Sequence, residues 1–114
     1  MSHTPTQTTA EQLTEQLVDR LNNEWKLIDL ENNREPYQYL TIEKGRKYAK
    51  LIVNFYASSR VEQRSVYCFI DRTSGAVYKS ASWKSPAKGI RFYVEQLLET
   101  PEMCDPYGSF LYQR

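Results

Sequence analysis

The residues best suited to carry chemistry in this sequence are cations placed around one tryptophan. Residues 75–91 read Gly-Ala-Val-Tyr-Lys-Ser-Ala-Ser-Trp-Lys-Ser-Pro-Ala-Lys-Gly-Ile-Arg. The cations of this segment are Lys79, Lys84, Lys88 and Arg91, and its tryptophan is Trp83. Lysine and arginine contact the phosphate oxygens of nucleic acids, and an indole ring can stack on a base or a sugar. The segment therefore points to an anionic, phosphate-bearing ligand.

The same segment predicts the start of a helix, because Ser85 is a good N-cap and Pro86 fits the first helical position. Cations at a helix N-terminus oppose the helix dipole by about 0.3–1 kcal/mol each. Three cations there favour a bound anion, which the free backbone N–H groups would also attract. The alternative is that Trp83 fills a corner between sheet and helix, with the cations extending around it. For Trp83 the core position is favoured, and for the cations the functional one.

Charge is distributed unevenly along the chain, although the formal net charge is only +1. Residues 37–93 carry eleven basic and three acidic residues, whereas the segments on either side are acidic. Such an asymmetry indicates an anionic partner, and nucleic acid is the natural polyanion. The predicted nucleic-acid-binding residues are Lys79, Trp83, Lys84, Lys88, Arg91, Lys47, Lys50, Arg60, Arg64 and Arg72. Because these are phosphate-type contacts, we expect sequence-tolerant binding to DNA or RNA.

Catalytic and metal-binding patterns are missing from the sequence. The one histidine, His3, lies in a polar N-terminal segment, and no phosphate-binding glycine loop or cluster of metal ligands occurs. We therefore expect a protein that is not an enzyme and needs no metal or cofactor. The two cysteines, Cys68 and Cys104, do not form a disulfide framework. Without a predicted signal peptide or membrane span, a cytoplasmic location is expected.

Hydrophobic periodicity predicts an α+β fold. A helix over residues 10–28 is indicated by a capping box at Thr9 and Gln12 and by apolar residues every three or four positions. Alternation and turn signals predict strands at 37–43, 47–57, 64–71 and 76–80, and a second helix over 86–99 follows. The expected architecture is a four-stranded antiparallel meander with helices on one face (α-β-β-β-β-α). Residues 1–8 are expected to be a disordered tail, and 9–114 a single domain.

The strands have two apolar faces. One is expected to pack against the helices, and its members are Leu51, Val53, Val66, Cys68 and Ile70. The other carries aromatic side chains at Tyr48, Tyr56, Tyr67 and Phe69. A face this apolar is expected either to be covered, by the first helix, the C-terminal arm or a second subunit, or to serve as a binding surface. Exposed aromatic patches also mark protein interfaces. The alternative function is therefore a protein-interaction module, either a homodimer or an inhibitor of a host protein.

Residues 64–91 resemble part of small uncharacterised proteins of tailed bacteriophages, including phages of marine and cyanobacterial hosts. The stretch that carries the resemblance is Ala-Ser-Trp-Lys-x-Pro-Ala-Lys at residues 81–88. The resemblance implies a viral origin and no particular activity. Together with the charge pattern, it suggests a phage accessory protein that binds nucleic acid in the cytoplasm of the infected host cell.

Overall fold

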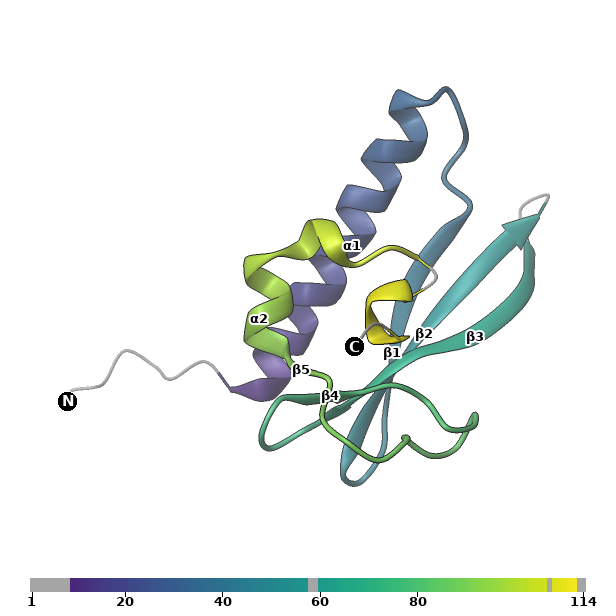
Figure 1. The fold of residues 1–114 in the computed structure, drawn as a ribbon. Coiled ribbons are helices and arrows are strands. Elements are labelled where there is room, and N and C mark those ends of the chain that lie inside the picture. Colours follow the sequence, from purple (N-terminus) through teal and green to yellow (C-terminus); the bar gives the residue numbers. More distant parts are fainter. Residues whose placement is uncertain (1–8, 58–59, 107, 113–114) are drawn as a thin grey trace.

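A computed structural model describes residues 9–57, 60–106 and 108–112 (Figure 1). The tail expected at residues 1–8 lies outside the described residues. The elements in chain order are α1 (Ala10–Glu31), β1 (Gln38–Lys44), β2 (Tyr48–Ala57), β3 (Arg60–Asp71), β4 (Ala76–Tyr78), β5 (Phe92–Tyr93), α2 (Val94–Glu99) and the 3-10 turns η1 (Pro101–Met103) and η2 (Ser109–Tyr112). The α+β class is confirmed. No helix in the described part of the chain is both long and apolar enough to span a bilayer.

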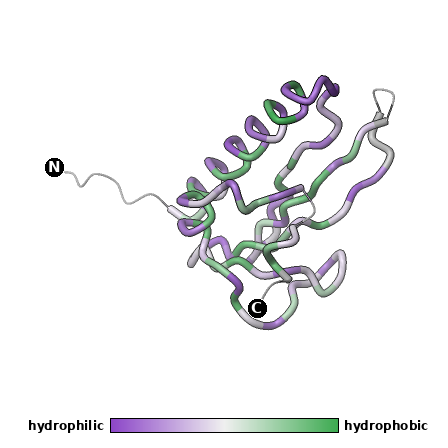
Figure 2. Tube along the Cα trace, turned by 45° about the horizontal axis from the view of Figure 1, so that its top comes forward, coloured by the Kyte–Doolittle hydropathy of each residue, from purple (hydrophilic) through white to green (hydrophobic). Residues whose placement is uncertain are grey.

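Helix α1 begins where the sequence predicts. The Thr9 hydroxyl accepts a hydrogen bond from the Gln12 backbone N–H, and the Gln12 side chain accepts one from the Thr9 N–H. One face of the helix is buried, including Leu17, Leu21 and Trp25. In Figure 2 hydrophobic and hydrophilic segments alternate along α1, as expected for an amphipathic helix. The helix runs three residues beyond the predicted end. Ile28, in this last part of the helix, is half exposed and does not belong to the buried stripe.

The sheet is antiparallel and has five strands in chain order, one more than predicted. Helices α1 and α2 pack together on one side of it (Figure 1). Between them lies a core that includes Leu51, Cys68, Ile70 and Leu97, each fully buried. The 3-10 turn η2 adds Phe110 and Leu111 to this core, so the C-terminal segment docks as an arm.

A β-bulge in β3 reverses the predicted alternation. Leu51 pairs with Cys68, but the next β2 residue, Ile52, pairs with Val66, so Tyr67 is an extra residue without a partner on β2. A bulge shifts the following residues to the opposite face of the sheet. Tyr67 therefore enters the core, where it is 4% exposed and its ring lies edge-on to Trp25. Val66, predicted to be buried in the core with Cys68, is only half-buried and pairs with Ile52 instead.

The predicted helix over residues 86–99 is wrong in its first half. Helix α2 begins only at Val94, because the preceding residues make backbone hydrogen bonds with the strand region instead. The Arg91 N–H donates to the Val77 carbonyl, and the Val94 N–H donates to the Gly75 carbonyl, so residues 92–93 form β5. Pro86 forms a bridge with Ser80 rather than starting a helix. Gly89 has φ of +97°, a conformation that a helix cannot contain.

Truncating the central core residue is expected to cost substantial stability. Leu51 is 0% exposed, so Leu51→Ala should lower the free energy of unfolding by about 2–5 kcal/mol in urea denaturation. The matched control is Ile90→Ala at a half-exposed site, which should change it by no more than about 0.5 kcal/mol. If both variants lower the free energy of unfolding by the same small amount, Leu51 does not lie in the core.

Both cysteines are expected to be unreactive in the folded protein. Burial raises the pKa of the Cys68 thiol and raises that of Cys104 to about 12. Because the thiolate is the nucleophile, neither residue should react with Ellman's reagent at pH 8 until denaturant is added, when both should react. Rapid modification of a thiol in the native protein would contradict the burial.

Candidate functional site

A tight turn carries Trp83 across the sheet face opposite α1. The turn spans Ser82–Ser85 and is closed by hydrogen bonds from the Ala81 and Ser82 N–H groups to the Ser85 carbonyl, at 3.0 and 3.1 Å. The Ser82 hydroxyl also accepts hydrogen bonds from the Lys84 and Ser85 N–H groups. The two residues at the tip of the turn, Trp83 and Lys84, are therefore presented by a hydrogen-bonded frame.

Trp83 lies at the surface, within cation–π distance of two basic side chains. Its side chain is 40% exposed, so the core position favoured from the sequence is wrong. The ammonium of Lys50 lies 4.7 Å from the centre of the ring system, and the guanidinium carbon of Arg64 lies 5.4 Å from it. Both distances fall within the range of cation–π attraction.

The bulge at Tyr67 is what brings Arg64 to this face. Cross-strand partners share a face of the sheet, and without the extra residue Arg64 would pair with Phe55 on the helix side. With the bulge it pairs with Asn54, on the same face as Lys50, and its Nε donates to the Asn54 side-chain oxygen at 3.2 Å. The position of Arg64 thus follows from a single backbone irregularity.

Next to the tryptophan, the turn between β1 and β2 and the tip residue Lys84 enclose a hollow of about 290 Å³. Its cationic lining residues include Arg46, Lys47, Lys50 and Lys84, and the lining also contains Tyr48, Phe69 and the acidic Glu43. We use the term basic surface for this hollow together with the adjoining tryptophan site. Its residues are Arg46, Lys47, Lys50, Arg64, Trp83 and Lys84.

Acidic neighbours neutralise only part of this charge. Lys50 pairs with Glu43 at 3.5 Å, and Lys44, at the rim of the hollow, pairs with Glu15 at 3.3 Å. In the part of the chain that the structure describes, no carboxylate forms an ion pair with Arg46, Lys47 or Lys84, although hydrogen bonds from the Ser74 and Thr73 backbone and, after them, the charge of Lys47 lower the pKa of the Asp71 carboxyl group. The basic surface therefore keeps a local excess of positive charge.

Several residues predicted to bind nucleic acid lie outside the basic surface. The Arg72 guanidinium hydrogen-bonds to Glu11, which lowers the pKa of that carboxyl group, and to the Gly45 carbonyl. Arg91 lines a separate hollow beside Met103. The side chain of Arg60 lies outside the described part of the structure.

The predicted grouping of cations at a helix start is also wrong, because α2 begins three residues after Arg91. Lys79 and Lys88 belong to the segment before the helix, where Lys79 is half-buried and Lys88 exposed. Arg46 belongs to the basic surface although it was not among the predicted residues. The sequence signal that could have identified Arg46 is its position beside Lys47 in the basic Lys-Gly-Arg-Lys turn at residues 44–47.

The open aromatic face expected as a protein interface is largely covered. Tyr67 and Phe69 are only 4% and 3% exposed, so the alternative in which this face is covered holds for them. Tyr48 is half-buried and packs edge-on against Phe69 and Tyr78. Tyr56 remains 37% exposed and stacks on Tyr39.

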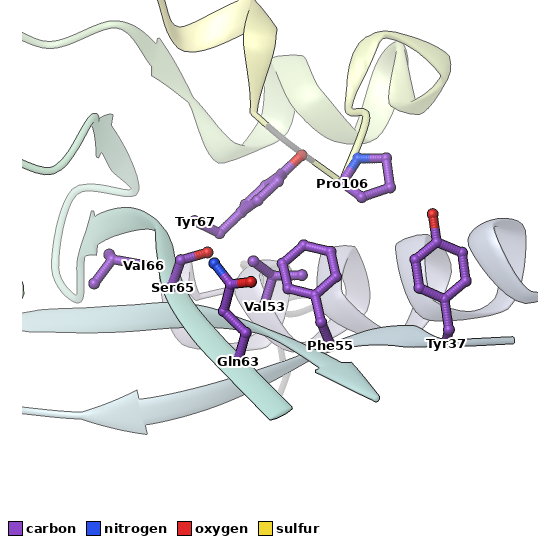
Figure 3. Close-up of a pocket in the computed structure, with 8 residues that line it drawn as sticks. All are labelled: Tyr37, Val53, Phe55, Gln63, Ser65, Val66, Tyr67 and Pro106. Atoms are coloured by element: carbon purple, nitrogen blue, oxygen red, sulfur yellow. The ribbon is translucent and has the colours of Figure 1, made fainter. Parts of the chain in front are cut away.

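A second hollow lies on the helix side of the sheet (Figure 3). It has a volume of about 340 Å³ and is walled by Tyr37, Phe55, Tyr67 and Pro106, with Gln63 at its edge. The Tyr67 hydroxyl is already used, since it donates to the Asp105 carbonyl at 2.8 Å. This hollow is largely aromatic and lacks the cations of the basic surface.

Comparison with known proteins places the chain in a family. Residues 2–113 match the family of unknown function DUF7717, and the chain therefore belongs to it. No curated protein and no solved structure matches the chain.

The charge around Trp83 can be tested with ionic quenchers. In a Trp25→Phe variant Trp83 is the sole tryptophan, and iodide should quench its fluorescence more strongly than caesium, relative to a free tryptophan derivative. The physical reason is that the cations of the basic surface concentrate anions near the ring. Adding Lys47→Ala and Lys84→Ala should reduce this preference. If the Trp25→Phe variant shows no preference for iodide over caesium relative to the free tryptophan derivative, the local excess of positive charge is contradicted.

Proposed function

We propose that the protein binds nucleic acid, without catalysing a reaction on it, through the basic surface. The observation that carries the proposal is a partly exposed tryptophan held against Lys50 and Arg64, beside a hollow whose lining is mostly cationic. Aromatic side chains interleaved with cations are typical of proteins that bind single-stranded nucleic acid without sequence preference.

The distribution of charge supports a polyanionic ligand over a single anion. Arg46, Lys47 and Lys84 line the hollow, and Arg64 lies against Trp83. Such spread-out cations match the repeated phosphates of a nucleic acid backbone. Because lysine and arginine on an open surface contact phosphates, the binding is sequence-tolerant. An accessory role in a phage-infected cell, to which residues 81–88 point, is part of this proposal.

Protein interaction is the second candidate function, and a different surface favours it. The end of α1 exposes Leu27, Ile28 and Leu30, each about half accessible to solvent. Apolar side chains exposed together are a common feature of protein interfaces. A homodimer or a complex with a host protein would use this end of the molecule, not the covered aromatic residues Tyr67 and Phe69.

Salt dependence of binding tests the first candidate. Fluorescence anisotropy with mixed-sequence DNA and RNA should show binding at low salt that weakens steeply as salt is raised. Lys47→Ala combined with Lys84→Ala should weaken binding to all sequences and flatten the log–log salt slope by about 1.5, as expected for two lost phosphate contacts.

The matched control removes two cations from the opposite side of the sheet. Arg20→Ala combined with Lys26→Ala changes the net charge equally, and both residues lie exposed on α1. This variant should bind like the wild type. If wild type shows no salt-sensitive binding to any probe, nucleic acid is not the ligand and the protein-interaction candidate replaces it.

A further inference from the structure

The tip of the Ser82–Ser85 turn combines two features that a ligand would meet together. Trp83 offers a partly exposed indole ring, and Lys84 follows it directly and lines the hollow. Lys50 joins the two places, since its ammonium lies over the Trp83 ring and its side chain also lines the hollow. A ligand group stacked on the ring is therefore adjacent to the site where an anion would be held.

We infer that the nucleic acid is single-stranded, with one unpaired base stacked on Trp83 and a neighbouring phosphate held in the hollow between the β1–β2 turn and Lys84. The inference rests on the proposed function and specifies its ligand. In a duplex, each base is already stacked between its neighbours and cannot offer a face to the indole ring except at an end. An unpaired base can be splayed out and can stack on an aromatic side chain.

The arrangement is also prepared before the ligand arrives. The hydrogen bonds that close the turn fix the backbone on both sides of Trp83, and Lys50 and Arg64 already lie against the ring. A side chain whose position is fixed in the free protein loses less conformational entropy on binding.

Three probes separate base stacking from phosphate attraction. Anisotropy at low salt is measured with a 15-nucleotide thymidine strand, an abasic strand of the same length, and a 15-base-pair duplex. The wild type should bind the thymidine strand at least several-fold more tightly than the abasic strand or the duplex. Trp83→Ala should weaken binding of the thymidine strand by about 10-fold or more while leaving the abasic strand unaffected, and Trp83→Phe should retain part of the difference.

The matched control is Tyr93→Ala, which removes an aromatic side chain of similar exposure outside the basic surface and should change none of the three affinities. Wild-type tryptophan fluorescence should also decrease on addition of the thymidine strand, and Trp83→Phe should abolish this change. If the duplex binds as tightly as the thymidine strand, or Trp83→Ala weakens all probes equally, the single-strand inference is wrong while the proposed function stands. If no probe shows salt-sensitive binding, the proposed function itself fails.

Discussion

The β-bulge at Tyr67 is the constraint on which much of this structure depends. Because one residue of β3 has no partner on β2, the side chains on either side of it follow opposite alternations. Between the bulge and the C-terminal end of β3, Cys68 and Ile70 face the helices. On the other side of the bulge, Arg64 and Val66 face away from them, while Tyr67 itself turns into the core. One inserted residue thus supplies both a core aromatic and a surface cation.

Burial of both faces of the β2–β3 ribbon is the second constraint. Leu51 and Val53 pack on the helix side, while Ile52 and Phe69, on the other side, are 1% and 3% exposed. Among the described residues, no helix covers this second face (Figure 1). Instead, the segment before β5 crosses it and places Trp83 near Lys50. The need to exclude water from Ile52 and Phe69 therefore accounts for the position of the turn, and the turn assembles the basic surface.

The sequence was sufficient to predict what local rules determine. The capping box at Thr9, the antiparallel strands from β1 to β4 and the burial of Leu51, Cys68 and Ile70 all followed from spacing and residue type. It could not predict the bulge, because residues 66–70 are all apolar and their pattern fits either face of the sheet. Ser85 and Pro86 satisfy helix-start rules, but pairing of residues 91–93 with β4 overrides them. Lys88 and Arg91 therefore lie away from Lys84, and the cations that lie near Lys84 and Trp83 are instead strand residues, such as Lys50 and Arg64.

The two tryptophans give the most direct test of the central claim, since each has an indole N–H that NMR resolves separately. Trp25 is buried and donates to the Cys104 carbonyl, whereas Trp83 lies in the basic surface. In a ¹⁵N-labelled protein titrated with an eight-nucleotide thymidine strand, the account predicts that the Trp83 indole resonance shifts and the Trp25 resonance does not. Backbone shifts should cluster at the β1–β2 turn and the Ser82–Ser85 turn. An unchanged Trp83 resonance at saturating oligonucleotide, or shifts centred on the exposed end of α1, would contradict it.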